Sequence, residues 1–310
     1  MPLEKIFLTG GTGFFGKSIL DMLLTGFKKD TEFVILSRDP KKFLSAFPEY
    51  TFLKNVRFVS GDVRDFIFPE EDFDGIIHAA TPAVTTLPPG EMRSIIIDGT
   101  KHVLDFARPC GAKRLLFTSS GAVYGPQKPE VLNVPESYPC FPATEYGIAK
   151  LEAEQMCLSS GISTGIARCF AFVGPRLNLD IHFAIGNFIR NGLDGKEIII
   201  QGDGTPLRSY LYADDLIEWL FAIYDCPKDG AIFNVGSPEG LSISELAHLV
   251  AAHFVPPPQV QILKTPVPGK LPVPYVPDVS RIRTELGVYM KNDLNSSIAR
   301  TIAFHRGKQK

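Results

Sequence analysis

Short runs of β-branched and aliphatic residues alternate with helical patterns through the first half of this chain. Most of these runs are almost continuously apolar, which is typical of strands buried on both faces of a parallel sheet. The expected strands are Lys5–Thr9, Glu32–Leu36, Val56–Ser60, Gly75–His78, Arg114–Thr118 and Ser163–Arg168, and the expected helices are Phe15–Thr25, Ile95–Arg108 and Thr144–Leu158. This order predicts an α/β fold with a parallel, doubly wound sheet of the Rossmann type.

The pattern changes after Arg168. The expected helices there are Phe183–Leu193, Asp214–Tyr224 and Ile243–Phe254, and the expected strands are Glu197–Gln201, Ile232–Val235 and Val260–Leu263. Eight prolines between Val255 and Pro277 exclude longer regular structure in that segment. We therefore expect residues 1–168 to form a dinucleotide-binding domain, to which residues 203–236 return. Residues 169–202 and 237–310 are expected to form a smaller α/β substrate-binding lobe.

Composition and charge exclude several classes of protein. Of the 310 residues, 45% are hydrophobic and 21% are charged, as in an ordinary soluble enzyme. A formal net charge of −2 gives no overall field to attract nucleic acid or an anionic membrane, so neither partner is expected. No apolar stretch approaches the roughly 20 residues of a membrane span. A strand is expected so close to Met1 that no signal peptide is predicted.

The cysteines predict a reducing compartment. There are five of them, and none is spaced as C-x-x-C. Scattered thiols in odd number are typical of a cytoplasmic protein without disulfides. His, Cys and carboxylate residues also show no spacing typical of a metal site, so no metal is expected.

A glycine-rich turn, "TGGTGFFG", joins the first expected strand to the first expected helix. Glycines with this spacing allow a tight turn and a close approach of the backbone to a pyrophosphate, which the helix N-terminus then binds. Between a strand and a helix of an alternating chain, the motif is a strong indication of dinucleotide binding. The cofactor-binding residues expected here are Gly10, Gly13, Phe14, Phe15 and Gly16.

The end of the second strand bears on the choice of cofactor. NAD-binding chains carry an acid there for the ribose hydroxyls, but this chain has Ser37 followed by Arg38. A small hydroxyl and an arginine suit the 2′-phosphate of NADP, so NADPH is favoured. In the alternative, Arg38 is a surface residue, Asp39 reaches the ribose, and the cofactor is NAD.

Two further strand ends are expected to contact the cofactor. Asp62 and Val63 follow the third strand, where adenine would lie. Ala79, Ala80 and Thr81 follow the fourth strand, where small side chains allow close approach.

Tyr146 and Lys150 form a Y-x-x-x-K pair on an expected helix, where positions i and i+4 share one face. A lysine ammonium near a phenol stabilises the phenolate, and the tyrosine can then exchange a proton with an alcohol oxygen. The fifth strand ends in "TSSGAVYG", which adds hydroxyl groups of Thr118, Ser119 and Ser120.

Together these motifs resemble those of the extended short-chain dehydrogenase/reductases, the NAD(P)-dependent epimerase/dehydratase family of nucleotide sugars. The resemblance covers nearly the whole chain and includes "GDVRD", "HAA", "SSGAVYG", "VGPR", "GDGTPLRSYLYADDL", "NVGS" and "DVSRIRTELG". It implies that Tyr146 is the acid/base, that Lys150 tunes it and bonds the nicotinamide ribose, and that Ser120 is the catalytic hydroxyl. Tyr124 is then a wall of the site.

The same resemblance argues against one reaction. In the family's 4,6-dehydratases an Asp-Glu pair occupies the positions of Gly121 and Ala122, which carry no acid or base here. The chain is therefore not expected to be a 4,6-dehydratase. Ketone reduction or epimerisation at a ring carbon remains.

The resemblance also implies where the substrate binds. Arg208 matches a diphosphate clamp, with pairing to Asp214 or Asp215 as the alternative, and Asn187 lies where the substrate lobe should contact the nucleotide, with a helix-surface asparagine as the alternative. The chain departs from the family at Ile96 and Ala171, where asparagines are usual, and His182 is expected to be packed or solvated rather than a ligand.

We expect NADPH-dependent reduction of a nucleotide-diphosphate-linked 4-keto (6-deoxy) sugar, with Tyr146 as the proton donor. A nucleotide-sugar 4-epimerase with tightly bound NAD is the alternative, and a noncatalytic dinucleotide-binding regulator is a third hypothesis. The resemblance further implies a cytoplasmic homodimer, formed through the helices at Ile95–Arg108 and Thr144–Leu158, with a role in polysaccharide biosynthesis.

Overall fold

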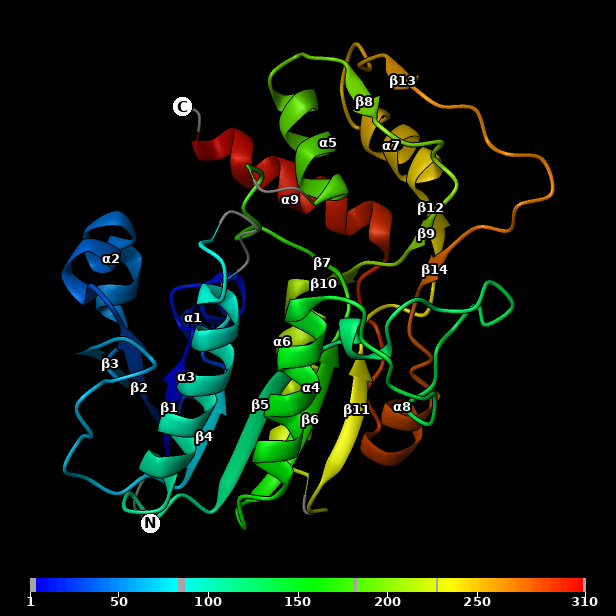
Figure 1. Cartoon of the computed structure of the whole chain (residues 1–310). Coiled ribbons are helices and arrows are strands. Elements are labelled where there is room, and N and C mark those ends of the chain that lie inside the picture. Colours follow the sequence, from blue (N-terminus) through cyan, green and yellow to red (C-terminus); the bar gives the residue numbers. More distant parts are fainter. Residues whose placement is uncertain (1–3, 83–86, 181–182, 227, 309–310) are drawn as a thin grey trace. The chain divides into compact units, whose positions relative to one another are not determined.

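The computed structural model describes residues 4–82, 87–180, 183–226 and 228–308. The chain divides into two compact units (Figure 1). The first unit comprises Met1–Gly125, Cys140–Arg168 and Trp219–Phe233, and the second comprises Pro126–Pro139, Cys169–Glu218 and Asn234–Lys310. In the described residues no helix is long and apolar enough to cross a membrane.

A seven-stranded sheet with the order β11-β6-β5-β4-β1-β2-β3 is the centre of the first unit. Its strands are β1 (Glu4–Thr9), β2 (Thr31–Ser37), β3 (Val56–Ser60), β4 (Gly75–His78), β5 (Arg114–Ser120), β6 (Ser163–Cys169) and β11 (Ala231–Val235). β1 pairs in parallel with both β2 and β4, β2 with β3, and β4 with β5. The strand order reverses between β1 and β4, and the carboxyl ends of the strands at such a reversal are where open α/β sheets commonly bind ligands.

Helices cover both faces of this sheet. They are α1 (Phe14–Leu24), α2 (Pro40–Ala46), α3 (Glu91–Ala107), α4 (Glu145–Leu158) and α6 (Ala213–Tyr224), with short 3₁₀ helices η1 (Pro48–Phe52) and η2 (Gly121–Tyr124). The ring of Phe7 on β1 lies 4.8 Å from Phe106 of α3. On β1, Ile6 precedes Phe7 and therefore points to the other face of the sheet, as does its partner Phe33 on β2. The ring of Phe33 lies 6.1 Å from that of Phe221 of α6. The predicted α/β, doubly wound parallel sheet is confirmed, and α3 and α4 lie side by side on one face (Figure 1).

Short paired strands and several helices form the second unit, which also includes the first half of α6. The helices are α5 (Ala184–Leu193), α7 (Ile243–Ala251), α8 (Ser280–Leu286) and α9 (Leu294–Lys308). The pairs are β7 (Phe172–Val173) with β10 (Leu211–Tyr212), β8 (Ile198–Ile200) with β13 (Val260–Ile262), and β9 (Leu207–Arg208) with both β12 (Leu241–Ser242) and β14 (Pro274–Tyr275). The proline-rich segment thus contributes only β13 and β14.

One strand boundary and one additional helix differ from expectation in ways that matter for the site. β5 continues to Ser120, two residues beyond the expected end, so all three hydroxyl residues belong to the strand. α2 was not predicted because seven residues are too few to show a helical period. Its start nevertheless carries local signals, since Asp39 caps the helix and Pro40 occupies its first turn.

Candidate active site

The turn between β1 and α1 is packed so closely that two of its glycines are required. Gly10 has a φ of 76°, and a Cβ there would lie 2.3 Å from the carbonyl oxygen of Ala79. A Cβ at Gly16 would lie 2.2 Å from the backbone of Gly11. The Gly13 N–H donates to the Gly10 carbonyl at 3.0 Å, which closes the turn. The backbone around the turn is therefore shaped as a dinucleotide requires.

The N-terminus of α1 also fits an anion. Gly13 is the N-cap residue and has no side chain to cap the helix. The first turn of α1 includes Phe14 and Phe15 and contains no acidic residue. The positive end of the helix dipole is therefore not neutralised by a carboxylate of that turn. A pyrophosphate fits this position.

At the end of β2, three consecutive residues have different environments. Ser37 is buried, whereas Arg38 is exposed. The Asp39 carboxylate accepts a hydrogen bond from the Lys42 N–H at 2.9 Å and caps α2. The Asp39 carboxylate is therefore engaged in capping α2. Arg38 is exposed and is the charged side chain of this group that does not cap the helix.

Asp62, expected near adenine, is held by an arginine that the sequence analysis did not single out. Arg64 donates to the two Asp62 oxygens at 2.8 and 3.1 Å and to Glu91 at 2.9 Å. The hydrogen bond from Arg64 is the main reason why the pKa of Asp62 is lowered. Val63 is buried against α3, since a Cβ at Gly99 would lie 2.9 Å from its Cγ1. The carboxylate of Asp62 is thus neutralised within the chain.

Lys150 is the most deeply buried cation of the candidate site. Its side chain projects from α4, and the residue is only 1% exposed. Its Nζ donates to the Thr118 carbonyl at 2.7 Å and to the Thr81 hydroxyl at 2.7 Å, and lies 4.7 Å from the ring centroid of Phe117. Thr81, which the sequence pointed to as a cofactor contact, is therefore a direct partner of Lys150.

The elements that carry Ser120 and Tyr146 are in contact. Ser120 ends β5, and its Oγ accepts from the Ala122 N–H at 3.2 Å, which caps η2. Gly147 follows Tyr146 on α4, and a Cβ there would lie 2.7 Å from the Ala122 carbonyl oxygen. Only glycine allows α4 to approach η2 this closely. Tyr146 itself is half-buried and packs against the hydrophobic core.

An ion pair lies beyond η2. Arg168 on β6 donates to both oxygens of Glu154 at 3.0 and 2.8 Å, and both residues are buried. The guanidinium carbon of Arg168 lies 4.9 Å from the ring centroid of Tyr124, which is 1% exposed. Glu154 stands one turn after Lys150, so the spacing Y-x-x-x-K-x-x-x-E was a signal that could have revealed it.

A buried histidine connects three elements below the site. The Nδ1 of His78 on β4 lies 2.7 Å from the hydroxyl of Thr9, and its Nε2 lies 3.0 Å from the hydroxyl of Thr100 on α3. Burial is the main cause that lowers the pKa of His78 to about 3, and the charge of Lys150 lowers it further. His78 is therefore neutral at physiological pH.

The expected substrate contacts belong to the second unit. Asn187 is half-buried on α5. Arg208 on β9 donates to the Leu207 carbonyl at 2.7 Å, and its guanidinium carbon lies 5.7 Å from the ring centroid of Tyr275. His182 lies outside the described residues.

The carboxylates considered as partners of Arg208 have other partners. Asp214 accepts from Arg300 at 3.0 Å. Asp215 accepts from the N–H groups of Lys291 and Asn292 at 3.1 and 3.2 Å. Arg208 is therefore not taken up by these two acids.

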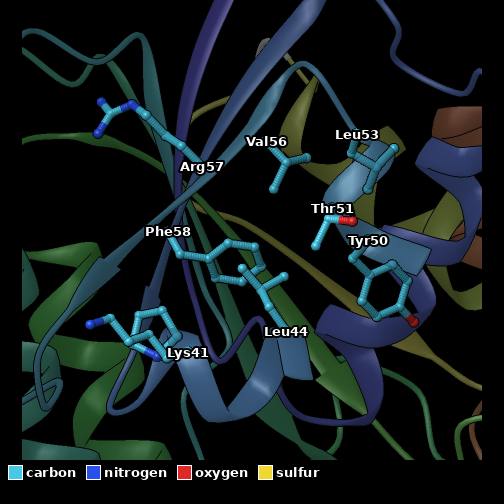
Figure 2. A pocket seen from close by; sticks show the side chains of 9 residues that line it. Lys41, Leu44, Tyr50, Thr51, Leu53, Val56, Arg57 and Phe58 are labelled. Atoms are coloured by element: carbon cyan, nitrogen blue, oxygen red, sulfur yellow. The ribbon is translucent and has the colours of Figure 1, made fainter. Parts of the chain in front are cut away.

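A cavity of about 330 Å³ lies between α2, η1 and β3 (Figure 2). Apolar side chains of Leu44, Val56 and Phe58 line it, and Lys41 and Arg57 belong to its rim. None of its lining residues is a candidate for chemistry. Among the residues that the structure describes, no group of three or more His, Cys, Asp or Glu side chains could hold a metal ion.

Comparison with known proteins identifies similar chains. The profile of the NAD dependent epimerase/dehydratase family matches residues 6–236. UDP-glucuronic acid decarboxylase 6 of Arabidopsis thaliana is 30% identical over 300 residues, covering 91% of this chain and 83% of the relative. UDP-glucuronic acid decarboxylase 1 of Xenopus tropicalis is 30% identical over 266 residues, covering 80% of this chain and 59% of the relative.

Solved structures show the same fold. The UDP-glucose 4-epimerase of Thermotoga maritima has a TM-score of 0.82 at 23% identity, covering 99% of this chain and all of that one. The UDP-glucuronic acid 4-epimerase of Bacillus cereus has a TM-score of 0.83 at 23% identity, covering 98% of this chain and 99% of that one. At these identities the likeness supports the architecture, including the parallel sheet described above.

The neutral, buried His78 predicts a pH-dependent stability. Its pKa is about 3 in the folded chain and about 6.5 when unfolded. Its contribution is therefore complete above pH 6.5 and is lost as the pH falls towards 3. Between pH 7 and pH 5 the free energy of unfolding should fall by about 2 kcal/mol from this group.

His78→Asn should remove that part of the pH dependence, although it lowers stability at neutral pH by disturbing the bonds to Thr9 and Thr100. Urea unfolding at a series of pH values measures the slope. His248→Gln, at an exposed histidine, is the matched control and should keep the wild-type slope. An unchanged slope in His78→Asn would show that His78 does not stay neutral in the folded chain.

Proposed function

Because the chain belongs to the NAD dependent epimerase/dehydratase family, we propose that it is a 4-epimerase of a nucleotide-diphosphate sugar. Its relatives support this substrate class, since their names describe enzymes of UDP-glucuronic acid and UDP-glucose. The catalytic residues in this proposal are Ser120, Tyr146 and Lys150. The ketone reductase expected from the sequence becomes the second candidate, because the named relatives are decarboxylases and epimerases.

The observation that carries the proposal is the chemistry of η2. Gly121 and Ala122 follow Ser120 there, and neither has an acid or a base. Dehydration in the family uses an Asp-Glu pair at these positions. Decarboxylation of a 4-keto uronic acid leaves a carbanion that must be protonated at a ring carbon, and these two positions provide no donor for it. Proton transfer at the C4 oxygen, which Tyr146 can perform, is the chemistry that remains.

In the proposed reaction Tyr146, as phenolate, takes the proton of the C4 hydroxyl. The buried ammonium of Lys150 favours the phenolate, and the Ser120 hydroxyl orients the sugar oxygen by a hydrogen bond. The nicotinamide cofactor, when bound, supplies hydride acceptance and return at C4. Tyr146 then returns the proton to the oxygen of the inverted carbon. The sugar is oxidised and reduced once each, so no external oxidant or reductant is needed.

The proposal also assigns residues to the binding of cofactor and substrate. The glycine turn and the N-terminus of α1 would hold the pyrophosphate of the cofactor, since the turn is closely packed and the helix is not capped by a side chain. Arg208 would bind the diphosphate of the substrate, for which a guanidinium is well suited. Asn187 is proposed as a further substrate contact. A cytoplasmic location and a role in polysaccharide biosynthesis stay predictions.

Tyr146→Phe should lower turnover by about 10²- to 10⁴-fold, because the ring keeps its shape and loses the group that exchanges the proton. Purified protein is incubated with UDP-glucose, UDP-N-acetylglucosamine or UDP-glucuronic acid, and the product is identified by NMR. Circular dichroism checks that the variant folds. A pentose product from UDP-glucuronic acid would show that the protein is a decarboxylase and not an epimerase. Full activity of Tyr146→Phe with every sugar would refute the assignment of Tyr146 as the acid/base.

The second candidate is NADPH-dependent reduction of a nucleotide-linked 4-keto sugar, and one observation favours it. Arg38 is exposed at the end of β2, while the neighbouring Asp39 is occupied as the cap of α2. A guanidinium at this position suits a 2′-phosphate better than a ribose hydroxyl. A reductase needs an exchangeable NADPH, whereas an epimerase regenerates its cofactor in each turnover.

Arg38→Ala distinguishes the two candidates. If Arg38 binds a 2′-phosphate, the charge-assisted hydrogen bond contributes roughly 1.5–3 kcal/mol, so NADPH affinity should fall about ten- to a hundredfold. NADH affinity should change little. Ser37→Asp should repel the phosphate and strengthen NADH binding. Dissociation constants of both cofactors measure this, and equal losses for the two would remove the support for NADPH.

We also propose a homodimer formed through α3 and α4. The two helices lie side by side and are joined by Arg93, which donates to Glu152 at 3.0 and 2.7 Å. Ile148 on α4 is 48% exposed, and Ile97 on α3 is only partly buried. A second copy that packs on these helices would cover this apolar surface.

Ile148→Glu should weaken the dimer, because association would bury a charge. Light scattering coupled to size exclusion measures the molar mass at micromolar concentration. Ile67→Glu, at a 90% exposed residue outside both helices, is the control and should remain dimeric. A wild-type protein that elutes as a monomer would contradict the proposal.

A further inference from the structure

We propose that Thr81 is a positioning residue for Lys150 and thereby sets the pKa of Tyr146. The inference rests on the proposed function in one respect, namely that Tyr146 is the acid/base. It adds a residue that acts through Lys150 and that the motifs did not assign to this role.

The first step is the need of a buried ammonium for acceptors. Lys150 is 1% exposed, and an ammonium without partners in such a place would lose its proton. Two oxygens, 2.7 Å away each, accept from its Nζ: the Thr118 carbonyl and the Thr81 hydroxyl. The Thr118 carbonyl is main chain within β5. Thr81 is the acceptor that a side-chain substitution can remove.

The second step is the way in which the loop holds Thr81. The Thr81 N–H donates to the Ala79 carbonyl at 3.0 Å, so the chain turns sharply after β4. The Ala79 N–H donates to the Thr9 carbonyl at 3.2 Å, and Gly10 packs directly on the Ala79 backbone. The position of the Thr81 hydroxyl is therefore set by the same contacts that shape the glycine turn.

The third step concerns the other charged groups around Lys150. His78 on β4 stays neutral because burial lowers its pKa to about 3, and Cys157 on α4 stays a thiol because burial raises its pKa to about 12. On β6, Arg168 is neutralised by Glu154.

The elements packed on α4 complete this environment. α3 contributes Arg93, which pairs with the partly exposed Glu152. η2 contributes the buried phenol of Tyr124, against the guanidinium of Arg168. Around neutral pH these named groups are neutral or paired with an opposite charge, so the two acceptors of the ammonium bear directly on the pKa of Lys150.

Removal of the Thr81 hydroxyl should lower the pKa of Lys150, since an N–H of the buried ammonium loses its acceptor. A less charged Lys150 stabilises the phenolate less, so the pKa of Tyr146 should rise. The loss of one charge-assisted hydrogen bond corresponds to about one unit in the pKa of Lys150, and the pKa of Tyr146 should rise by up to about that amount.

The experiment titrates Tyr146 directly in Thr81→Val and Thr81→Ser. Tyrosinate absorbance is followed against pH in the protein without substrate, and the curve of Tyr146→Phe is subtracted to isolate Tyr146. Tyr210 and Tyr224 do not interfere, because burial raises their pKa values well above the ordinary range. Thr81→Val should shift the titration upwards by up to about one unit, and Thr81→Ser should restore it.

Thr51→Val is the matched control, since Thr51 is exposed and its hydroxyl donates to the nearby Pro48 carbonyl. The pH profile of kcat should shift in parallel with the titration. An unchanged or lower Tyr146 pKa in Thr81→Val overturns the inference, as does a failure of Thr81→Ser to restore it. If Tyr146→Phe keeps full turnover, the proposed function fails, while the substrate-free titration still decides whether Thr81 positions Lys150.

Discussion

The buried ammonium of Lys150 is the constraint on which the candidate site depends. A charge that is removed from water must be surrounded by acceptors, or it loses its proton. Here the acceptors come from β5 and from the loop after β4, while the lysine itself comes from α4. Three segments that are distant in the sequence must therefore meet at one nitrogen. Tyr146 stands one helical turn before Lys150 on α4, so in the proposal it depends on the same contacts.

Close backbone contacts hold these segments in place. Gly10 brings the turn after β1 against Ala79, and Gly147 brings α4 against the carbonyl of Ala122. In both places a Cβ would overlap a backbone atom that cannot move aside easily. The site therefore depends on glycines for two different reasons. Gly10 shapes the turn that would receive a cofactor. Gly147 places α4, which carries Tyr146, next to η2, which follows Ser120.

The sequence predicted the parts of the structure that depend on local patterns. The apolar runs identified the strands of the large sheet, and the glycine turn was found between β1 and α1 because a short motif carries it. Contacts between distant segments were not predictable in this way. The partnership of Arg64 with Asp62, and that of Thr81 with Lys150, arise only when the strand ends converge. The extension of β5 to Ser120 was missed because the apolar run ends at Phe117, and the following hydroxyl residues carry no local signal that continues the strand.

The family relationship narrows the reaction less than the composition of η2 does. Decarboxylases, dehydratases and epimerases of sugar nucleotides can all begin by oxidising C4, and in the proposed function Tyr146 with Lys150 would serve that step. They differ in the step that follows oxidation. Dehydration and decarboxylation act at a carbon beside the C4 ketone, and that chemistry requires a further acid or base near the ring. Gly121 and Ala122 provide none at the positions where the dehydratases carry theirs. In the proposed function, Tyr146 exchanges a proton at the C4 oxygen alone, which serves both epimerisation and ketone reduction. The two reactions differ in whether the cofactor returns its hydride to the same sugar.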